Sequence, residues 1–124
     1  MSEQGDVYVG GSMVHGSDRT AKSDLRPVHT DEILRRVVEL PVQRWRWKDR
    51  PDGEEHLGPM AQDFHAAFGL GTDPRGIATV DADGVALAAI QELARLVSAQ
   101  RAELDRQATE LERLRRLLED ALER

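Results

Sequence analysis

Residues 83–124 read DGVALAAIQELARLVSAQRAELDRQATELERLRRLLEDALER, and this stretch decides the fold. Large apolar residues recur in it at alternating spacings of three and four, which is a heptad repeat with Ile90 at position a and Leu93 at position d. A repeat of about 3.5 residues drifts around a straight helix of about 3.6 residues per turn, so the apolar seam stays covered only when helices wind around each other. The sequence therefore predicts a coiled coil between chains. The alternative is a long amphipathic helix folded back on its own domain.

The predicted coiled-coil interface is mixed in character. Ile90 and Val97 at position a favour two strands, whereas the leucines at later a positions do not. Gln100 and Gln107 occupy consecutive d positions, where each buried amide must find a partner or costs about 1 to 3 kcal/mol. Polar layers select register and oligomer number, so the heptads alone leave dimer and trimer open. The predicted interface residues are Ile90, Leu93, Val97, Gln100, Leu104, Gln107, Leu111, Leu114 and Leu118.

The composition fits one small domain plus this coil: the chain has 124 residues, 40% of them hydrophobic and 32% charged. No apolar run approaches the roughly 18 residues of a membrane span, so no membrane partner is expected. The net charge of −6 argues against a general affinity for nucleic acid. The chain has no cysteine, and His15, His29, His56 and His65 are spaced too widely for a short metal motif. We therefore expect no metal and no other cofactor, and synthesis in the cytoplasm.

The residues before the coil predict short elements. Residues 5–20 alternate β-formers with glycine, which indicates two short strands and a turn, or a disordered leader. A helix is predicted from Thr30, a suitable N-cap, to the residue before Pro41. Its apolar stripe is formed by Ile33, Leu34, Val37 and Val38.

A hairpin and a second helix are predicted next. Residues 42–48, VQRWRWK, alternate as a half-buried strand, and residues 51–53, PDG, predict a turn before a returning strand at 56–58. Residues 61–68 predict a helix stopped by Gly69. Residues 77–81 suggest one more strand, after which Asp81 or Asp83 would cap the long helix. The predicted core of the body is Trp45, Trp47, Phe64 and Phe68.

The Trp strand also suggests a competing function. Basic and aromatic residues interleave over residues 44–50, as they do on platforms that bind single-stranded nucleic acid. If the strand alternates, however, both tryptophans face inward and cannot stack on bases. We therefore expect no nucleic acid partner, and keep a single-stranded nucleic acid binding module and a coiled-coil adaptor without a chaperone role as the alternatives.

Four segments, taken in order, resemble one family: SDLR at 23–26, PVQRWRWK at 41–48, HLGPMAQ at 56–62, and the region from Ala78 onward that ends in the heptad helix. Together they resemble the C-terminal intramolecular chaperone domain of phage endosialidases, tail fibres and tail spikes, which is also found in the myelin regulatory factor. The resemblance covers about residues 21–124. It implies a homotrimer that holds three copies of an upstream β-stalk in register, as part of a phage or phage tail-like particle.

The resemblance also implies self-cleavage before a serine, which here would fall between Lys22 and Ser23. Ser23 would be the nucleophile, beside Asp24. Many members use a lysine five residues later as base, but this chain has Val28 there, and an aliphatic side chain cannot accept a proton. His56 is the candidate substitute base. We therefore expect a segment that resembles a serine peptidase but is inactive, in which the serine and aspartate form a turn or cap.

The predicted architecture is α+β and mostly helical, a small globular body with short strands followed by a long C-terminal helix in a parallel trimeric coiled coil. Residues 1–20 would be the end of a β-stalk or a leader, residues 21–82 the chaperone body, and residues 83–124 the trimerisation helix. The expected partners are further copies of the chain and the upstream β-stalk of the same or a related fibre protein.

Overall fold

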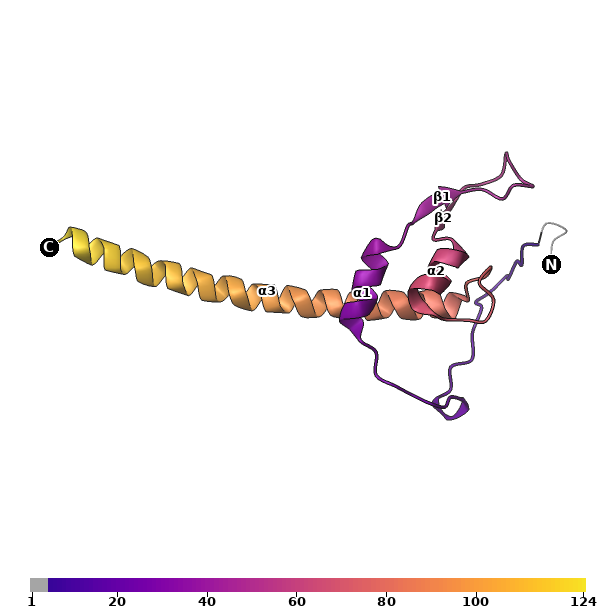
Figure 1. Ribbon diagram of the computed structural model, residues 1–124, viewed down its shortest axis with the longest axis horizontal. Helices are drawn as coiled ribbons and strands as arrows, with labels where there is room; N and C mark the ends of the chain where they lie inside the picture. The colour runs from indigo at the N-terminus through magenta and orange to yellow at the C-terminus, as the bar shows by residue number, and fades with distance from the viewer. Residues whose placement is uncertain (1–4) are drawn as a thin grey trace.

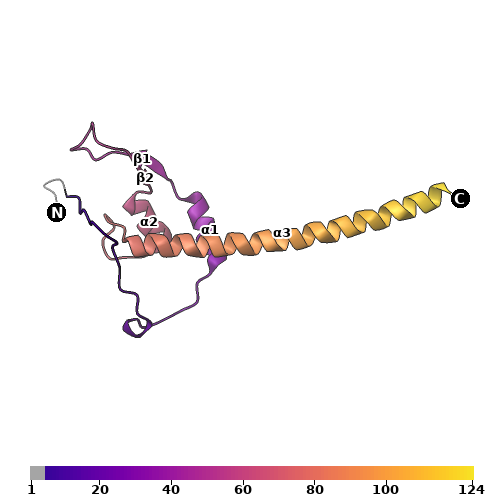
Figure 2. The same cartoon turned by 180° about the vertical axis from the view of Figure 1, so that it is seen from behind.

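The computed structural model describes residues 5–124, which form a small body at one end of a long helix (Figure 1). The fold is α+β and mostly helical, as predicted. The first described residues lie at the body end, and the C-terminus lies at the far end of the helix (Figure 2). The elements are the 3₁₀ turn η1 (Arg19–Ala21), α1 (Thr30–Glu39), β1 (Gln43–Trp45), β2 (His56–Gly58), α2 (Ala61–Phe68) and α3 (Thr79–Leu122).

Helix α3 has 44 residues and is therefore about 66 Å long. It begins before the predicted start at residue 83. The carbonyl of Ala78 already accepts the backbone amides of Asp81, at 3.0 Å, and Ala82, at 3.1 Å. None of the helices formed by residues 5–124 combines the length and the apolar character that a membrane span requires.

The strand predicted over residues 77–81 is wrong. A single short strand without a neighbour leaves its amides unpaired, whereas the helix satisfies them internally. Neither Asp81 nor Asp83 caps α3, because the N-cap is Ala78, which has no side-chain oxygen. Asp81 lies instead in the first turn, where a carboxylate is favoured by the positive end of the helix dipole.

Helix α1 crosses the N-terminal part of α3, and this is the main contact between elements in the described residues (Figure 1). Of its predicted apolar stripe, Ile33, Leu34 and Val37 are half-buried. Val38 stays 76% exposed, which shows that the contact covers a narrower face than predicted.

Helix α2 has the bounds that the sequence predicts. It ends at Gly69, which adopts the left-handed conformation with φ of 63°, and its amide donates to the carbonyl of His65 at 2.8 Å. The rings of Phe64 and Phe68 lie 4.9 Å apart on one face. Among the described residues the buried hydrophobic core consists of Phe64, Val85 and Ala89, which is small for a chain of this length.

The predicted hairpin is present: its second strand has the predicted bounds, and its first strand is shorter than predicted. β1 and β2 are antiparallel, and Arg44 pairs with Leu57 at the centre of the register. The strand predicted over residues 42–48 ends at Trp45, because the chain then turns: the amide of Arg50 donates to the carbonyl of Trp47 at 3.0 Å. The rings of Trp45 and Trp47 still meet edge to face at 4.9 Å.

Residues 5–18 form no strand in the single chain. Strand pairing in this segment would therefore require other copies, because lone strands leave their backbone groups unpaired. The segment ends at η1, where Asp18 Oδ1 accepts the amide of Thr20 at 2.9 Å. The first four residues of the segment predicted as a stalk end or leader lie outside the described residues.

Candidate assembly surface and serine segment

The heptad residues of α3 form a seam, residues 90–118 at positions a and d, that is exposed along its whole length. Ile90 is 59% exposed, Leu104 is 64% exposed and Leu118 is 61% exposed. The polar members are exposed as well, and Gln107 Nε2 donates to Glu103 Oε1 of the same helix at 3.1 Å. The seam does not pack against the body. This excludes the alternative of a long amphipathic helix folded back on its own domain.

The body packs against a different face of α3. Val85, Ala89 and Glu92 are its buried residues, and they occupy heptad positions c and g. The seam occupies positions a and d. Because the two faces are separate, α3 holds α1 with one of them and leaves the other uncovered.

Glu92 is the polar centre of the contact between α1 and α3. It is 3% exposed, and its Oε2 accepts the hydroxyl of Thr30 at 3.0 Å and Nε of Arg95 at 3.0 Å. The bond from Arg95 holds the pKa of Glu92 below its ordinary value of 4.5; burial opposes this shift, and the bond from Thr30 adds to it. The Glu92 carboxylate is therefore hydrogen-bonded from both helices of the contact, by Thr30 of α1 and by Arg95 of α3.

Sequence reasoning missed Glu92 and misassigned Thr30. Thr30 is the first residue of α1, and its hydroxyl bonds to Glu92 instead of capping the helix; the N-cap is His29, whose side chain makes no capping bond. A signal was available in the sequence, because Val85, Ala89 and Glu92 follow the spacing of four and three that marks one face of a helix.

A second link joins α1 to α2. Arg36 Nη1 donates to the carbonyl of Ala67 at 2.7 Å, and Nη2 of the same side chain pairs with Glu32 at 2.7 Å. This carbonyl lies in the last turn of α2, where backbone carbonyls have no partner within the helix. The Arg36 guanidinium therefore supplies the missing hydrogen bond and also links α1 to α2.

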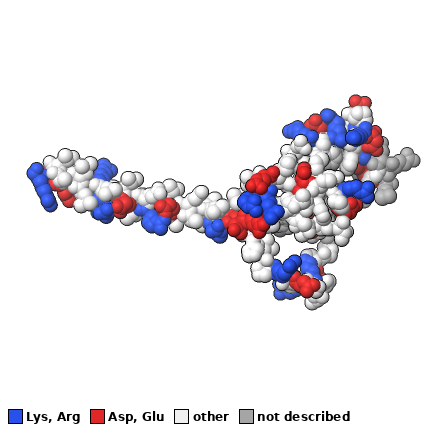
Figure 3. All heavy atoms as spheres, in the orientation of Figure 1, with Lys and Arg blue, Asp and Glu red and all other residues white. Residues whose placement is uncertain are grey.

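Charged residues flank the seam without forming a patch of one sign. Figure 3 shows basic and acidic side chains mixed along α3. In the single chain Glu110 accepts Nε of Arg113 at 3.0 Å, which lowers the pKa of Glu110, and Arg115 Nε lies 3.4 Å from Glu119 Oε1. These pairs are local to one helix and exposed, so each stabilises it only weakly.

The serine segment lies away from the body contacts. Lys22, Ser23 and Asp24 are all exposed. Ser23 Oγ donates to Asp24 Oδ2 over a long 3.5 Å, and Lys22 Nζ donates to Ser17 Oγ at 2.6 Å. Asp24 has a positive φ of 56°, a conformation that suits a turn.

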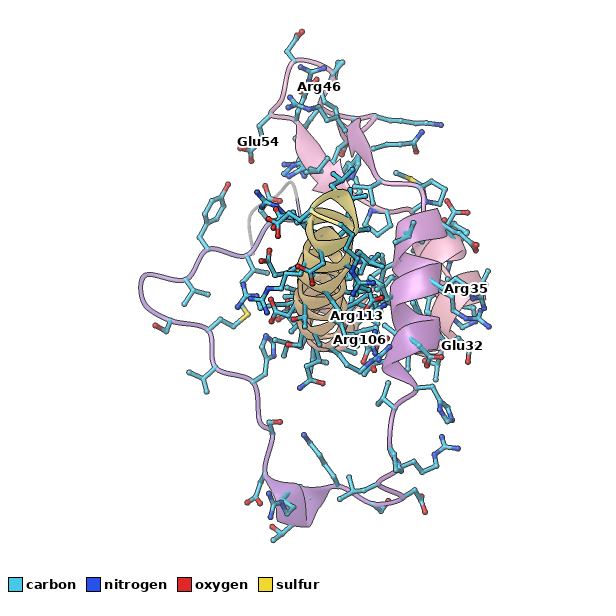
Figure 4. All side chains as sticks on the ribbon, turned by 90° about the vertical axis from the view of Figure 1, so that its left-hand side faces the viewer. Glu32, Arg35, Arg46, Glu54, Arg106 and Arg113 are labelled. Carbon is cyan, nitrogen blue, oxygen red and sulfur yellow. The ribbon has the colours of Figure 1, made fainter. Side chains whose placement is uncertain are left out.

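The single chain does not bring His56 to Ser23. His56 lies in β2, where its ring packs against that of Trp45, with the ring centres 4.8 Å apart and the planes tilted by 33°. Figures 1 and 4 both show the hairpin on one side of α3 and η1, just before the serine, on the other. Val28, at the position of the family's lysine, is 59% exposed. In the part of the chain that the structure describes, neither His56 nor position 28 supplies a base to Ser23, whose hydroxyl contacts only the Asp24 carboxylate, at 3.5 Å.

The predicted body-core residues are placed unequally. Phe64 is 4% exposed, and Phe68 and Trp45 are half-buried. Trp47 is 48% exposed in the single chain. Across residues 5–124 no group of three His, Asp or Glu side chains comes together as a metal site.

A family model with the description "Chaperone of endosialidase" matches the chain over residues 17–69. The matched range contains the serine segment, α1, the hairpin and α2, and it ends ten residues before α3 begins at Thr79. No curated protein matches the chain at the threshold of the search.

Proposed function

We propose, from the match of residues 17–69 to the endosialidase chaperone model, that the chain is an assembly domain in which three copies join through α3. Its role is to hold three upstream segments in register while they fold. By the same family likeness, its setting is a fibre or spike of a phage or phage tail-like particle, made in the cytoplasm.

The observation that carries the proposal is the uncovered seam. A 44-residue helix with exposed apolar residues on one face is a poor monomer, because isolated helices owe most of their stability to packing of that face. The body covers only the turns around Val85, Ala89 and Glu92. Further copies of α3 supply the missing contacts without disturbing α1.

Charge and apolar pattern favour parallel helices in register. In a parallel coil, position g of one helix faces position e of its neighbour five residues later. Glu110 then faces Arg115 of the next copy, and Leu117 faces Leu122. The first pair is oppositely charged and the second is apolar, so both favour this arrangement, and the ion pairs within each helix are exchanged for pairs between helices.

A trimer accounts better than a dimer for the mixed seam. Leucine at position a, as at Leu104, Leu111 and Leu118, is not the pattern that selects two strands. The amides of Gln100 and Gln107 satisfy each other when copies meet around an axis, and they fix the register.

Assembly helps a β-stalk because strand pairing between chains is slow. Such pairing loses chain entropy before it gains contacts. Joining the chains first raises the effective concentration of the upstream segments, so their strands should pair faster. The first described residues and the body lie at the same end of α3 (Figure 1). Three parallel helices would therefore present three upstream segments side by side.

Self-cleavage is not part of the proposed function. A serine nucleophile needs a base within about 3 Å of its hydroxyl. Ser23 contacts the carboxylate of Asp24 at 3.5 Å, and Lys22 bonds to Ser17 instead. We infer that the segment acts as a turn between the upstream residues and the body.

Nucleic acid binding receives little support from the hairpin. Arg44 and Arg46 both pair with Glu55, at 3.4 Å and 3.3 Å, so their charges are partly neutralised on the strand that would bind a phosphate backbone. The acidic net charge of −6 opposes such binding as well.

The test is the mass of the purified full chain by light scattering at micromolar concentration. The expected result is three times 13.9 kDa. Refolding from urea, followed by the tryptophan fluorescence of the body, should speed up with concentration if assembly precedes completion of the fold. A mass of one chain at all concentrations would refute the proposal, and a mass of two would refute the trimer.

A further inference from the structure

The tip of the hairpin, residues 46–54, holds the first described residues of the chain. Arg50 Nη1 forms an ion pair with Asp6 Oδ2 at 2.7 Å, although the two residues are 44 positions apart. Both side chains are partly covered, with 23% of Arg50 and 36% of Asp6 exposed. The bond to Asp6 raises the pKa of Arg50. The contact joins the segment before η1 to the hairpin tip, across η1, α1 and β1.

The hairpin tip is built to present this guanidinium. The amide of Gly53 donates to the carbonyl of Arg50 at 2.9 Å, and Arg46 Nε donates to the carbonyl of Gly53 at 2.9 Å. A side chain at position 53 would lie 3.0 Å from that Arg50 carbonyl, so glycine permits the turn. Figure 4 shows Arg46 and Glu54 at the tip, away from α3.

A recess of about 250 Å³ lies between the tip and the first described residues. Asp6 and Tyr8 line it from one side. The other side is formed by His56 of β2 and by four residues of the tip, Trp47, Arg50, Gly53 and Glu54. The recess thus combines one cation with an aromatic wall.

We propose that the hairpin tip is a docking surface for residues 5–8, with Arg50 as its anchor. This inference rests on the proposed function in one respect: it identifies residues 5–8 as the end of the stalk that the assembly domain holds. Docking there fixes where each upstream segment leaves the body, on the side of α3 opposite to η1. The serine segment then lies in the tether between the docked residues and α1, not at the point of attachment.

Paired cysteines test the docking in the full chain, which has no cysteine of its own. Val7→Cys with Glu54→Cys leaves Asp6, Tyr8 and Arg50 in place, and a short bismaleimide should close the pair within one chain. Adding Arg50→Ala should lower the rate of cross-linking about two- to fivefold, as expected for a partly exposed ion pair. Exchanging the charges, Asp6→Arg with Arg50→Asp, should restore it.

The matched control moves one thiol along the loop. The control variant combines Val14→Cys with the same Glu54→Cys. Val14 is 87% exposed, so we expect this pair to cross-link more slowly than the Val7 pair. Its cross-linking rate should not change when Arg50→Ala is added. The proposal is overturned if Arg50→Ala leaves the Val7 pair unchanged, or if products join two chains instead of closing one. Light scattering on the same samples separates the hypotheses: an Arg50-dependent cross-link in a monomeric protein would refute the proposed function but not the docking.

Discussion

A carboxylate in the middle of the seam should dissolve the assembly. Leu104→Asp changes an a position that lies well beyond the body, so the substitution leaves the contacts of α1 and α2 untouched. In the single chain the side chain is exposed, and the variant should therefore fold its body normally while it loses its partners.

The magnitude follows from the exposure. Leu104 keeps 64% of its surface in the single chain, and burying a whole leucine is worth about 1.5 to 3 kcal/mol. Burying the exposed part of Leu104 between copies therefore contributes about 1 to 2 kcal/mol per chain to the free energy of association, or about 3 to 6 kcal/mol for three chains. Aspartate removes this gain and brings three carboxylates into one desolvated layer. Since about 1.4 kcal/mol changes an equilibrium constant tenfold, association should weaken by at least about two orders of magnitude.

The assay is light scattering, together with circular dichroism, because α3 beyond the body should also lose helicity once it is alone. Ala102→Asp is the matched control, since it places the same carboxylate two residues away at position f, on the outer side of the coil. The control should remain trimeric. A trimeric mass for Leu104→Asp would refute the heptad assignment, and monomers from both variants would show that charge anywhere on α3 is the cause.

Three further predictions concern other residues. Gln107→Leu replaces a polar d layer by an apolar one and should raise the melting temperature of the assembly while broadening its distribution of masses; no change in either would place this amide outside the seam. Because the pKa of Glu92 is lowered in the folded state, its stabilising contribution is complete above its ordinary value of 4.5 and is lost as the pH falls through the lower folded value. Urea unfolding between about pH 6 and about pH 3 should show this loss, and Glu92→Gln should have a shallower pH dependence; equal slopes would contradict the role of the carboxylate. The purified chain should keep an intact mass of 13.9 kDa for days, whereas a fragment beginning at Ser23 that disappears in Ser23→Ala would show self-cleavage.

The elements that depend on local chemistry could be predicted from the sequence. The bounds of α2 follow from its aromatic pair and from Gly69, and the pairing of the hairpin strands follows from the turn formers at residues 51–53. The heptad gave the position of the seam on α3, which the structure leaves exposed. Its burial between copies stays a prediction, as do the roles of the serine segment and of the aromatic body.

The features that could not be predicted depend on partners distant in sequence. Thr30 is a good N-cap by local rules, but its hydroxyl bonds to Glu92, 62 residues away. Asp6 and Arg50 meet across 44 residues, and nothing in either local stretch marks them as a pair. The apparent strand at residues 77–81 has β-forming residues, but no neighbouring strand, so helix formation prevails.

If α3 assembles as proposed, its arrangement should couple assembly to folding of the body. Ala89 and Glu92, which hold α1, alternate along the same turns with Ile90 and Leu93, which begin the seam. Packing of α1 therefore orders the first turns of the seam, and winding of the seam orders the turns that α1 needs. A helix is costly to start and cheap to extend, so the body contact can nucleate α3 and the coil can propagate it toward Leu122. Substitutions that break the Thr30 and Glu92 contact should consequently weaken assembly as well as the body, although neither residue lies on the seam.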